Sequence, residues 1–246
     1  MTTVLILGGT AEASALAWAL QTWPGLRAIT SLAGRTRSPE WLPGKTRTGG
    51  FGGVDGLTHY LEEQAIDLVI DATHPFAETI SHHAALAAER AAIQRLRLTR
   101  PLWAKQPGDH WIDAIDAVKA AERLPGLARR VFLTSGHREL EAFAGLDDIW
   151  FLIRTIEPVA GPQPRQALCI NARGPFDEAS ERALFEEHRI DALVTKASGG
   201  SATYAKIAAA RRLGLPVIMI QRPPPPAGPI VHNTDDALTW LRQVTA

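Results

Sequence analysis

The sequence predicts an α/β protein of two domains, each with a mostly parallel sheet and helices on both of its faces. Short runs of apolar or β-branched residues alternate with Ala-, Leu- and Glu-rich stretches of helical length, as in strand–helix–strand units. Prolines and a glycine interrupt this alternation between residues 100 and 110. Because the alternation then resumes, we predict a first domain over residues 1–98 and a second over 99–246.

The first predicted domain opens with an apolar strand that runs into a pair of glycines, and an Ala-rich helix follows. Its third strand is apolar for most of its length, which is typical of a strand buried on both faces of a sheet. The predicted strands are 4–7, 26–30, 67–71 and 96–98, and the predicted helices are 11–22, 55–64 and 76–93.

The second predicted domain repeats the alternation after the break. A run of prolines over 223–226 ends strand character after Ile220, because proline cannot donate to a strand ladder. The predicted strands are 131–134, 149–154, 167–170, 192–196 and 217–220. The predicted helices are 113–124, 137–143, 177–188, 203–213 and 234–244.

Composition narrows the function classes. The 246-residue chain carries 26 basic and 26 acidic residues, whereas a protein that binds along nucleic-acid phosphates normally has a basic surplus. Its single cysteine, Cys169, allows neither an internal disulfide nor a Cys-rich metal site, so we predict no metal. The N-terminus lacks the features of a signal peptide, and no apolar run approaches the roughly 20 residues that span a bilayer. We therefore expect a cytoplasmic protein without nucleic-acid or membrane partners, either a monomer or a small homo-oligomer.

The turn after the first strand is a candidate phosphate-binding loop. Gly8, Gly9 and Thr10 stand between the strand and a helix, where glycine lets a phosphate approach the backbone amides and the helix N-terminus adds partial positive charge. A dinucleotide-binding fold has its phosphate loop here, although Ala13 replaces the third glycine of the usual fingerprint. Glu12 adds a carboxylate that would compete with a pyrophosphate. The alternative is a tight turn that binds no ligand.

The end of the second strand indicates which dinucleotide binds. NAD-dependent enzymes usually place an acidic residue there to hold the ribose hydroxyls, whereas an arginine accommodates the 2′-phosphate of NADP. This end contains no acidic residue, and it offers Ser31 and Arg35, with Arg37 behind them. We therefore predict NADPH as the cofactor, and a solvated basic loop is the alternative.

A glycine-rich loop over Gly49–Gly53 precedes the next helix. It holds four glycines in five residues, and such a run usually serves a close backbone approach or a positive φ. We expect Gly50, Phe51 and Gly52 to contact the cofactor, and a flexible surface loop is the alternative.

The loop after the buried strand 67–71 lies at the strand's carboxyl end, where open α/β sheets bind ligands. Thr73 and His74 are the candidate cofactor-binding residues in this loop. Either side chain can equally cap the helix that follows Pro75.

Several motifs occur in order along nearly the whole chain. In the first half they are Gly8–Thr10, Ser31–Arg35, Gly49–Gly53 and Asp71–Ala77. In the second half they are Thr134–Gly136, Arg154, Glu157–Pro158, Gly174–Phe176, Thr195–Gly200, Val217–Ile220 and Arg222–Pro223. Together they resemble the NADPH-dependent precorrin-6A reductases of cobalamin biosynthesis. This resemblance implies two Rossmann-like domains and the reduction of one macrocycle double bond, which converts precorrin-6A to precorrin-6B, with the substrate held between the domains.

A precorrin carries many carboxylates, so its binding site needs basic side chains and anion-binding loops. In the second half, polar and glycine-rich segments follow the strands 131–134 and 192–196, and basic residues lie at or near other strand ends. The expected substrate-binding residues are Ser135, Gly136, Arg154, Lys196, Ser198, Gly199 and Arg222.

The reduction also needs a proton beside the hydride. His74 is the candidate general acid, because histidine normally titrates near neutral pH, and the alternatives are Tyr204, water or a substrate carboxyl group. Two other functions remain open. One is an NADPH reductase of another small anionic substrate, of the dihydrodipicolinate-reductase type, and the other is a non-catalytic NADP-binding sensor.

Overall fold

The computed structural model describes residues 1–34, 41–159 and 161–245, and the chain forms two compact units. Unit 1 consists of Met1–Pro101 and Pro223–Ala246, and unit 2 consists of Leu102–Arg222. Each unit contains one six-stranded sheet in which every strand pair is parallel. The predicted fold class, two Rossmann-like domains with mostly parallel sheets, is confirmed.

The sheet of unit 1 has the strand order β12-β5-β4-β1-β2-β3. This is the Rossmann order 3-2-1-4-5-6 with β12 in the sixth position. Its strands are β1 (Thr2–Leu7), β2 (Leu26–Leu32), β3 (Lys45–Thr48), β4 (Leu68–Asp71), β5 (Gln94–Leu98) and β12 (Ile230–Val231).

The sheet of unit 2 has the order β6-β11-β10-β7-β8-β9. It follows the same pattern, with β7 in the place of β1, β10 in the place of β4, and β6 in the sixth position. Its strands are β6 (His110–Ala114), β7 (Arg130–Leu133), β8 (Trp150–Thr155), β9 (Ala167–Asn171), β10 (Ala192–Lys196) and β11 (Pro216–Ile220).

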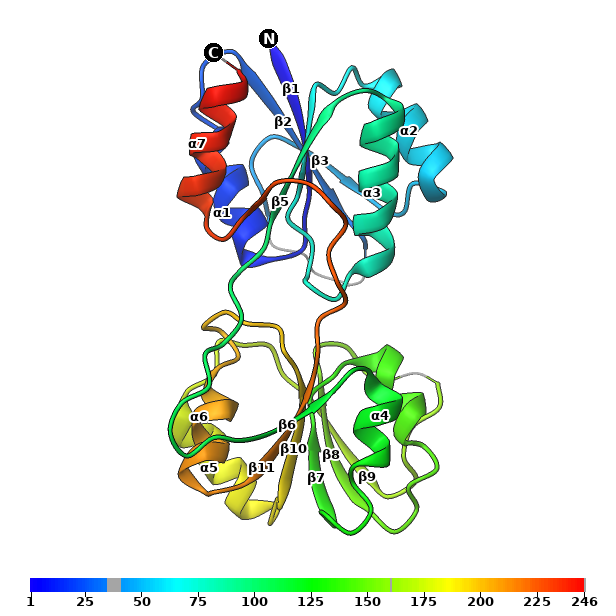
Figure 1. The fold of residues 1–246 in the computed structure, drawn as a ribbon, viewed down its shortest axis with the longest axis vertical. Helices are drawn as coiled ribbons and strands as arrows, with labels where there is room; N and C mark the ends of the chain where they lie inside the picture. The colour runs from blue at the N-terminus through cyan, green and yellow to red at the C-terminus, as the bar shows by residue number, and fades with distance from the viewer. Residues whose placement is uncertain (35–40, 160, 246) are drawn as a thin grey trace. The chain divides into compact units, whose positions relative to one another are not determined.

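Helices cover both faces of each sheet (Figure 1). In unit 1, α1 and α7 lie on one face, and α2 and α3 lie on the other. In unit 2, α5 and α6 lie on the face opposite α4. The helices are α1 (Ala11–Leu20), α2 (Gly53–Glu63), α3 (Glu78–Arg90), α4 (Ala117–Glu122), α5 (Glu178–Glu187), α6 (Ala205–Arg212) and α7 (Thr234–Val244), and a 3₁₀ helix, η1, spans His137–Phe143.

Alternating side chains of β1 explain why unit 1 buries both faces of its sheet. Val4 and Ile6 point into the apolar cluster that contains α1 and α7, whereas Leu5 and Leu7 point into the cluster that contains α2 and α3. All four side chains are at most 1% exposed. A strand that must be apolar on both faces reads as one continuous apolar run, and this run made β1 predictable.

The predicted domain division is wrong for the C-terminal segment. Residues 223–246, which we placed in the second domain, belong to unit 1. Their strand β12 pairs with β5, and their helix α7 packs against α1. Ala237 and Leu241 of α7 are fully buried in the apolar cluster of α1, so this contact accounts for the observed division.

The prediction missed β3, β6 and β12, and it placed residues 113–114 in a helix. β3 is the polar sequence Lys-Thr-Arg-Thr at a sheet edge, and β12 has only two residues, so neither contains the apolar run that predicts a strand. The helix after β6 begins only at Ala117, because the side chain of Asp116 caps it by accepting from the Lys119 amide at 2.8 Å.

Candidate functional site

The turn between β1 and α1 presents amide groups that no described residue accepts from. Gly9 has φ +103°, and a Cβ added there would meet nothing within 4 Å, so the space over the turn is open. Among the described residues, the N–H groups of Gly9, Thr10, Ala11 and Glu12 have no acceptor. Free amides at a helix N-terminus bind anions, so this turn fits the pyrophosphate of a dinucleotide.

Thr10 connects this turn to the neighbouring strand end. Its hydroxyl donates to the carbonyl of Ala72 at 2.7 Å and accepts from the Ala13 amide at 3.1 Å. The Thr10 hydroxyl is thus engaged within the protein, so the predicted contact of Thr10 with the cofactor would use its amide. The Glu12 carboxylate, which would compete with a pyrophosphate, lies 3.8 Å from a guanidinium nitrogen of Arg100 that offsets its charge.

The ends of β2 and β3 lie next to each other. Ser31 is buried and pairs in register with Arg47, whose Nη1 donates to the Ser31 hydroxyl at 2.8 Å. The Gly8 amide donates to the carbonyl of Ser31, so Ser31 links the phosphate turn to β3. Arg35, the predicted partner of the 2′-phosphate, lies outside the described residues.

Arg47 also organises the glycine-rich loop. Its guanidinium carbon lies 3.8 Å from the centre of the Phe51 ring, and its Nη2 donates to the Gly50 carbonyl at 2.9 Å. Gly52 has φ +84°, which favours glycine over every other residue. A Cβ at Gly56 would lie 1.8 Å from the Phe51 carbonyl oxygen, so α2 can approach the loop only with glycine at that position.

A buried polar network supports the loop after β4. The Asp71 carboxylate is completely buried and lies 2.5 Å from Nη1 of Arg97, which is itself 4% exposed. Asp71 also accepts from the Thr73 hydroxyl at 2.6 Å and from the Thr73 amide at 3.2 Å. Ser81 of α3 joins the network as the second acceptor of Arg97, at 2.5 Å. The hydroxyl of Thr73 is therefore engaged in a hydrogen bond within the protein, and Thr73 is held in one position.

His74 follows this network at the carboxyl end of β4. Its Nδ1 accepts from the Phe76 amide at 3.2 Å, so the ring is held close to the backbone on that side. Its ring centre lies 5.9 Å from that of Phe76. The bond fixes the orientation of the ring.

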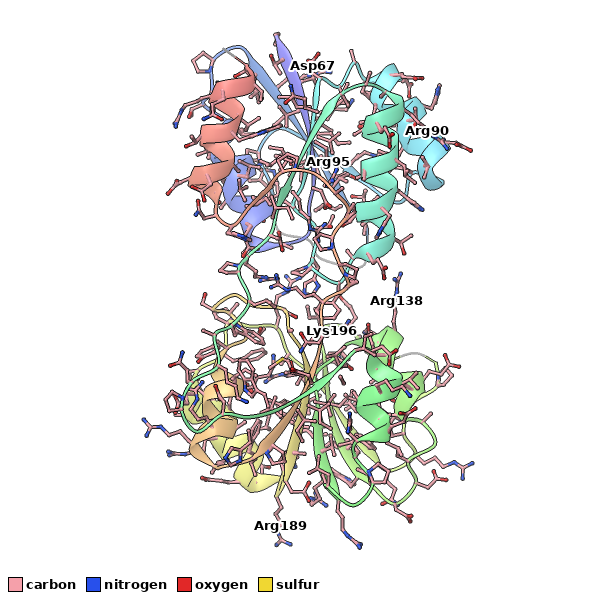
Figure 2. All side chains as sticks on the ribbon, viewed as in Figure 1. Asp67, Arg90, Arg95, Arg138, Arg189 and Lys196 are labelled. Carbon is pink, nitrogen blue, oxygen red and sulfur yellow. The ribbon has the colours of Figure 1, made fainter. Side chains whose placement is uncertain are left out.

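In unit 2, the equivalent strand ends of β7 and β10 bring together Ser135, Gly136 and Lys196. Ser135 is 3% exposed, and its hydroxyl has no hydrogen-bond partner among the residues described. Lys196 extends from the end of β10, and its Nζ lies 2.5 Å from a carboxylate oxygen of Glu139 (Figure 2). The sequence prediction therefore placed these three residues correctly at neighbouring strand ends and missed the carboxylate between them.

Arg222 holds the loop that follows β10. Its Nε donates to the Ala197 carbonyl at 2.7 Å, and its Nη2 donates to the Ser198 carbonyl at 2.6 Å. Gly199 has φ +65°, so the loop turns sharply there. Arg222, Ser198 and Gly199 thus form one structured loop beside Lys196.

Arg154 occupies a different environment from the other predicted substrate residues. Its guanidinium forms a two-point ion pair with the Glu181 carboxylate, with Nη2 3.0 Å from Oε2. The Phe176 ring covers it, at 3.7 Å from ring centre to guanidinium carbon. Arg154 is 8% exposed and Glu181 is 2% exposed, so the pair lies beneath the strand ends.

Lys206 is a second buried cation in this environment. It is 5% exposed, and its Nζ lies 5.7 Å from the centre of the Trp103 ring. Burial lowers the pKa of Lys206 to about 7, with Arg154 acting in the same direction and Glu181 opposing it. Two cations therefore share one carboxylate, and the group holds excess positive charge when Lys206 is protonated.

Replacing Lys206 by methionine is expected to change how stability depends on pH. In the unfolded chain a lysine titrates near a pKa of about 10.4, so between about pH 7 and pH 10 the unfolded state binds the extra proton. The free energy of unfolding therefore rises with pH in this window, and Lys206→Met removes that contribution. Urea unfolding at about pH 7 and about pH 9 should show a smaller gain for the variant than for the wild type.

The matched control for Lys206 is Lys119→Met, because Lys119 is exposed and pairs with Glu122 at 2.8 Å. That variant should keep the wild-type gain between the two pH values. Equal gains for Lys206→Met and the wild type would show that Lys206 does not titrate in this range.

A small hollow of about 200 Å³ adjoins the loop after β10 in unit 2. It contains Ala197 of that loop, and it buries Nε1 of Trp111, which has no acceptor within the described part of the chain. The lining residues are Leu102, Trp103, Trp111, Asp113, Ala197, Met219 and Gln221.

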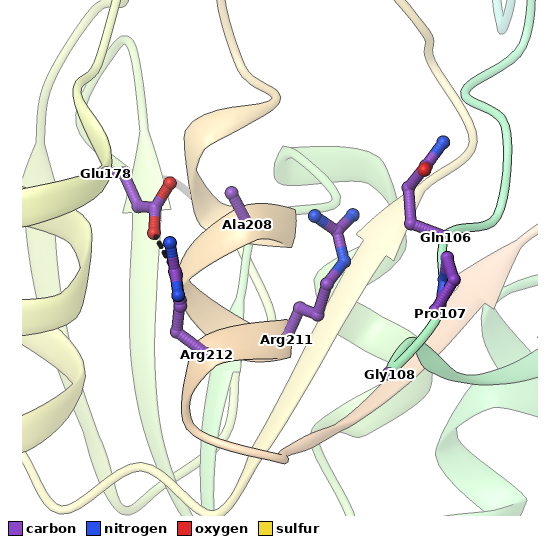
Figure 3. A pocket seen from close by; sticks show the side chains of 7 residues that line it. All are labelled: Gln106, Pro107, Gly108, Glu178, Ala208, Arg211 and Arg212. Atoms are coloured by element: carbon purple, nitrogen blue, oxygen red, sulfur yellow. Dashed lines mark hydrogen bonds and ion pairs between the residues drawn. The ribbon is translucent and has the colours of Figure 1, made fainter.

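A larger hollow of about 590 Å³ lies away from these residues, between segment 106–108, Glu178 of α5 and the outer face of α6 (Figure 3). Its cations already have partners: Arg211 bonds Asp109 at 2.9 Å, and Arg212 bonds Glu178 at 3.3 Å. It includes none of the predicted site residues. Size alone therefore does not identify the functional site.

Neither a metal site nor a membrane-spanning helix is found in the described part of the chain. Over residues 1–34, 41–159 and 161–245, no three His, Cys, Asp or Glu side chains come together as a metal site would require. In the same ranges, no helix has both the length and the apolarity to cross a membrane.

Sequence reasoning missed Arg47, Glu139 and the Asp71–Arg97 pair. Arg47 lies in a polar strand that has no apolar signal. Glu139 and the Asp71–Arg97 pair depend on contacts between distant segments, which a single sequence does not display. One signal was available for Arg97, because a charged residue within an otherwise predicted buried strand normally has a buried partner.

Comparison with known proteins gives consistent matches over the whole chain. Residues 3–242 match the family described as Precorrin-6x reductase CbiJ/CobK. The chain is 51% identical over 246 residues to the precorrin-6A reductase of Rhodococcus erythropolis, covering 100% of this chain and 99% of that protein. It is 46% identical over 244 residues to the precorrin-6A reductase of Mycobacterium tuberculosis, covering 98% of both.

A solved structure also matches this chain. The structure named CobK precorrin-6A reductase is 41% identical, and the match covers 99% of this chain and 97% of that one with a TM-score of 0.92.

Proposed function

The chain belongs to the precorrin-6x reductase family, and we propose that it reduces one double bond of precorrin-6A with NADPH to give precorrin-6B. As a member of this family it is an oxidoreductase that acts on a CH–CH bond in cobalamin biosynthesis. The proposal adds the cofactor, the residues that bind it, and the residues that bind the substrate.

The free amides of the β1–α1 turn are the observation that carries the cofactor proposal. Four consecutive N–H groups, from Gly9 to Glu12, point to no acceptor among the described residues. They lie at the first strand of a sheet with the Rossmann order, where a dinucleotide pyrophosphate binds. We propose that these amides bind the pyrophosphate, with Gly8 and Gly9 keeping the turn tight.

The end of β2 supports NADPH over NADH. It carries Ser31 and Arg35 and no carboxylate that would repel a 2′-phosphate. We propose that both residues contact this phosphate, and that Gly50, Phe51 and Gly52 border the adenosine half of the cofactor. Charge-assisted hydrogen bonds of this kind are about twice as strong as neutral ones.

We propose that the loop at Thr73 and His74 receives the nicotinamide. When bound, NADPH supplies the hydride, and the chain must supply a proton to the neighbouring carbon. Asp71 holds Thr73 in place, and Nε2 of His74 delivers the proton. A general acid must first take up a second proton at Nδ1, which displaces the Phe76 amide; at 3.2 Å this bond is at the long end of the range and costs little to break.

We propose that unit 2 binds the carboxylates of the substrate. Lys196, Ser135, Gly136 and the loop held by Arg222 offer a cation, a free buried hydroxyl and a sharply turned backbone at the strand ends. Arg154 adds positive charge from a buried position, although its guanidinium already forms an ion pair with Glu181. The single cysteine and a reduced cofactor favour the cytoplasm as the place of this reaction.

The decrease of NADPH absorbance in the presence of purified precorrin-6A tests this function. We expect turnover with NADPH and much slower turnover with NADH. Turnover only with another small anionic substrate would instead indicate a reductase of the dihydrodipicolinate-reductase type. NADPH binding without turnover of any substrate would indicate an NADP-binding sensor.

A further inference from the structure

We propose that Arg47 determines the preference for NADPH by binding the 2′-phosphate beside Ser31. This inference rests on the proposed use of NADPH, and it assigns to β3 a residue that the usual reading of the second strand overlooks.

The sheet register places Arg47 at the right strand end. In a Rossmann fold the adenosine ribose lies at the carboxyl end of the second strand. Ser31, at the end of β2, pairs in register with Arg47, and the Gly8 amide donates to the Ser31 carbonyl at 2.9 Å. The phosphate turn, Ser31 and Arg47 therefore occupy adjacent strand ends along one edge of the sheet.

The side chain of Arg47 is held in one orientation before any ligand binds. Its Nη1 donates to the Ser31 hydroxyl at 2.8 Å and to the Gly49 carbonyl at 3.1 Å, and its Nη2 donates to the Gly50 carbonyl at 2.9 Å. Its guanidinium carbon lies 3.8 Å from the centre of the Phe51 ring and 5.1 Å from that of Tyr60. A side chain that is already ordered loses little conformational entropy when it binds a phosphate.

No carboxylate of the described residues neutralises the charge of Arg47. In the part of the chain that the structure describes, Arg47 forms no ion pair, and its Nε–H and one N–H of Nη2 have no acceptor. The side chain is half-buried, so these donors remain accessible. A guanidinium with two donors left over can bind a phosphate through two oxygens, which a serine hydroxyl alone cannot do.

The test compares the binding of NADP⁺ and NAD⁺, which differ only in the 2′-phosphate, by titration calorimetry on the full chain. The wild type is expected to prefer NADP⁺. In Arg47→Met, the affinity for NADP⁺ should fall roughly 10-fold to 100-fold more than the affinity for NAD⁺, the loss expected for charge-assisted hydrogen bonds to the 2′-phosphate. Arg47→Lys should retain part of the preference for NADP⁺, because lysine keeps the positive charge but lacks the paired N–H donors of the guanidinium.

Lys45→Met is the matched control. Lys45 lies two residues earlier on the same strand, is exposed, and donates to the Gln64 side chain at 2.8 Å. The variant removes the same charge without touching Ser31, so the ratio of the two affinities should stay as in the wild type.

The outcomes separate the inference from the proposed function. Equal losses for NADP⁺ and NAD⁺ in Arg47→Met would show that Arg47 only supports the glycine-rich loop, and the inference would be wrong. A wild type that binds both dinucleotides equally would instead contradict the proposed use of NADPH. If Arg47→Met does not fold, Arg47→Lys decides the matter through the same ratio.

Discussion

Replacing Arg97 by methionine is expected to lower the free energy of unfolding of unit 1 by about 3–5 kcal/mol, the usual cost of breaking a buried ion pair from one side. The substitution leaves the Asp71 carboxylate completely buried, with Thr73 as its only hydrogen-bond donor among the described residues. An uncompensated buried charge is among the most destabilising changes a single substitution can make. Scanning calorimetry should show the melting temperature of unit 1 falling by roughly 10–20 °C.

Arg90→Met is the control for this experiment. Arg90 contacts Asp55 at 2.6 Å, nearly as closely as Arg97 contacts Asp71, but the two side chains are 54% and 92% exposed. The control should cost less than about 1 kcal/mol, because water screens an exposed pair. Adding Asp71→Asn to Arg97→Met should restore part of the loss, since no buried carboxylate then remains. Equal costs for Arg97→Met and Arg90→Met would contradict the role given to burial.

Replacing His74 by alanine is expected to lower kcat about 100-fold or more at saturating NADPH, since a positioned general acid typically contributes about 10²–10⁴-fold. The alanine variant removes both the proposed proton donor and the acceptor of the Phe76 amide. Steady-state turnover of precorrin-6A by NADPH measures this effect. If turnover stays near the wild-type value, His74 is not the acid.

His74→Asn separates the chemical role of His74 from its structural role. An asparagine side chain commonly accepts from the amide two residues further on, so it can keep the bond to Phe76 while lacking an acidic proton. If His74 is the proton donor, the asparagine variant should be as slow as the alanine variant. Wild-type turnover in His74→Asn would show that the residue only shapes the loop. His82→Ala, an exposed histidine of α3, should change kcat less than about 2-fold.

The sequence predicts the apolar framework well because a strand that is buried on both faces appears in the sequence as a continuous run of apolar residues. β1 and β4 are continuous apolar runs, and each is followed by a polar or glycine-rich turn at the strand end where a Rossmann sheet binds its ligand. For the same reason the sequence alone indicates the turn at Gly8–Thr10 and the loop at Thr73 and His74 as candidate sites.

The parts that the sequence did not predict depend on contacts between distant residues. Asp71 and Arg97 are 26 positions apart, and Arg154 and Glu181 are 27 positions apart, so neither pair has a spacing that a helix or strand would reveal. The sequence did not indicate Arg47 because its edge strand is polar and lacks the apolar run that predicts a strand. The packing of α7 in unit 1 also depends on tertiary contacts. Its apolar stripe would fit any open sheet face equally well, so the sequence does not show which unit it joins.

The sixth strand of each sheet has a consequence for how the chain is made. Unit 2 is one continuous stretch, whereas unit 1 needs β12 and α7 from the far end of the chain. On the ribosome, residues 1–101 emerge first, but the apolar side of α1 stays open to water until α7 has emerged. The domain that is synthesised first is thus completed last. A polypeptide released early, after residue 222, would carry a finished unit 2 and a unit 1 that lacks its closing helix.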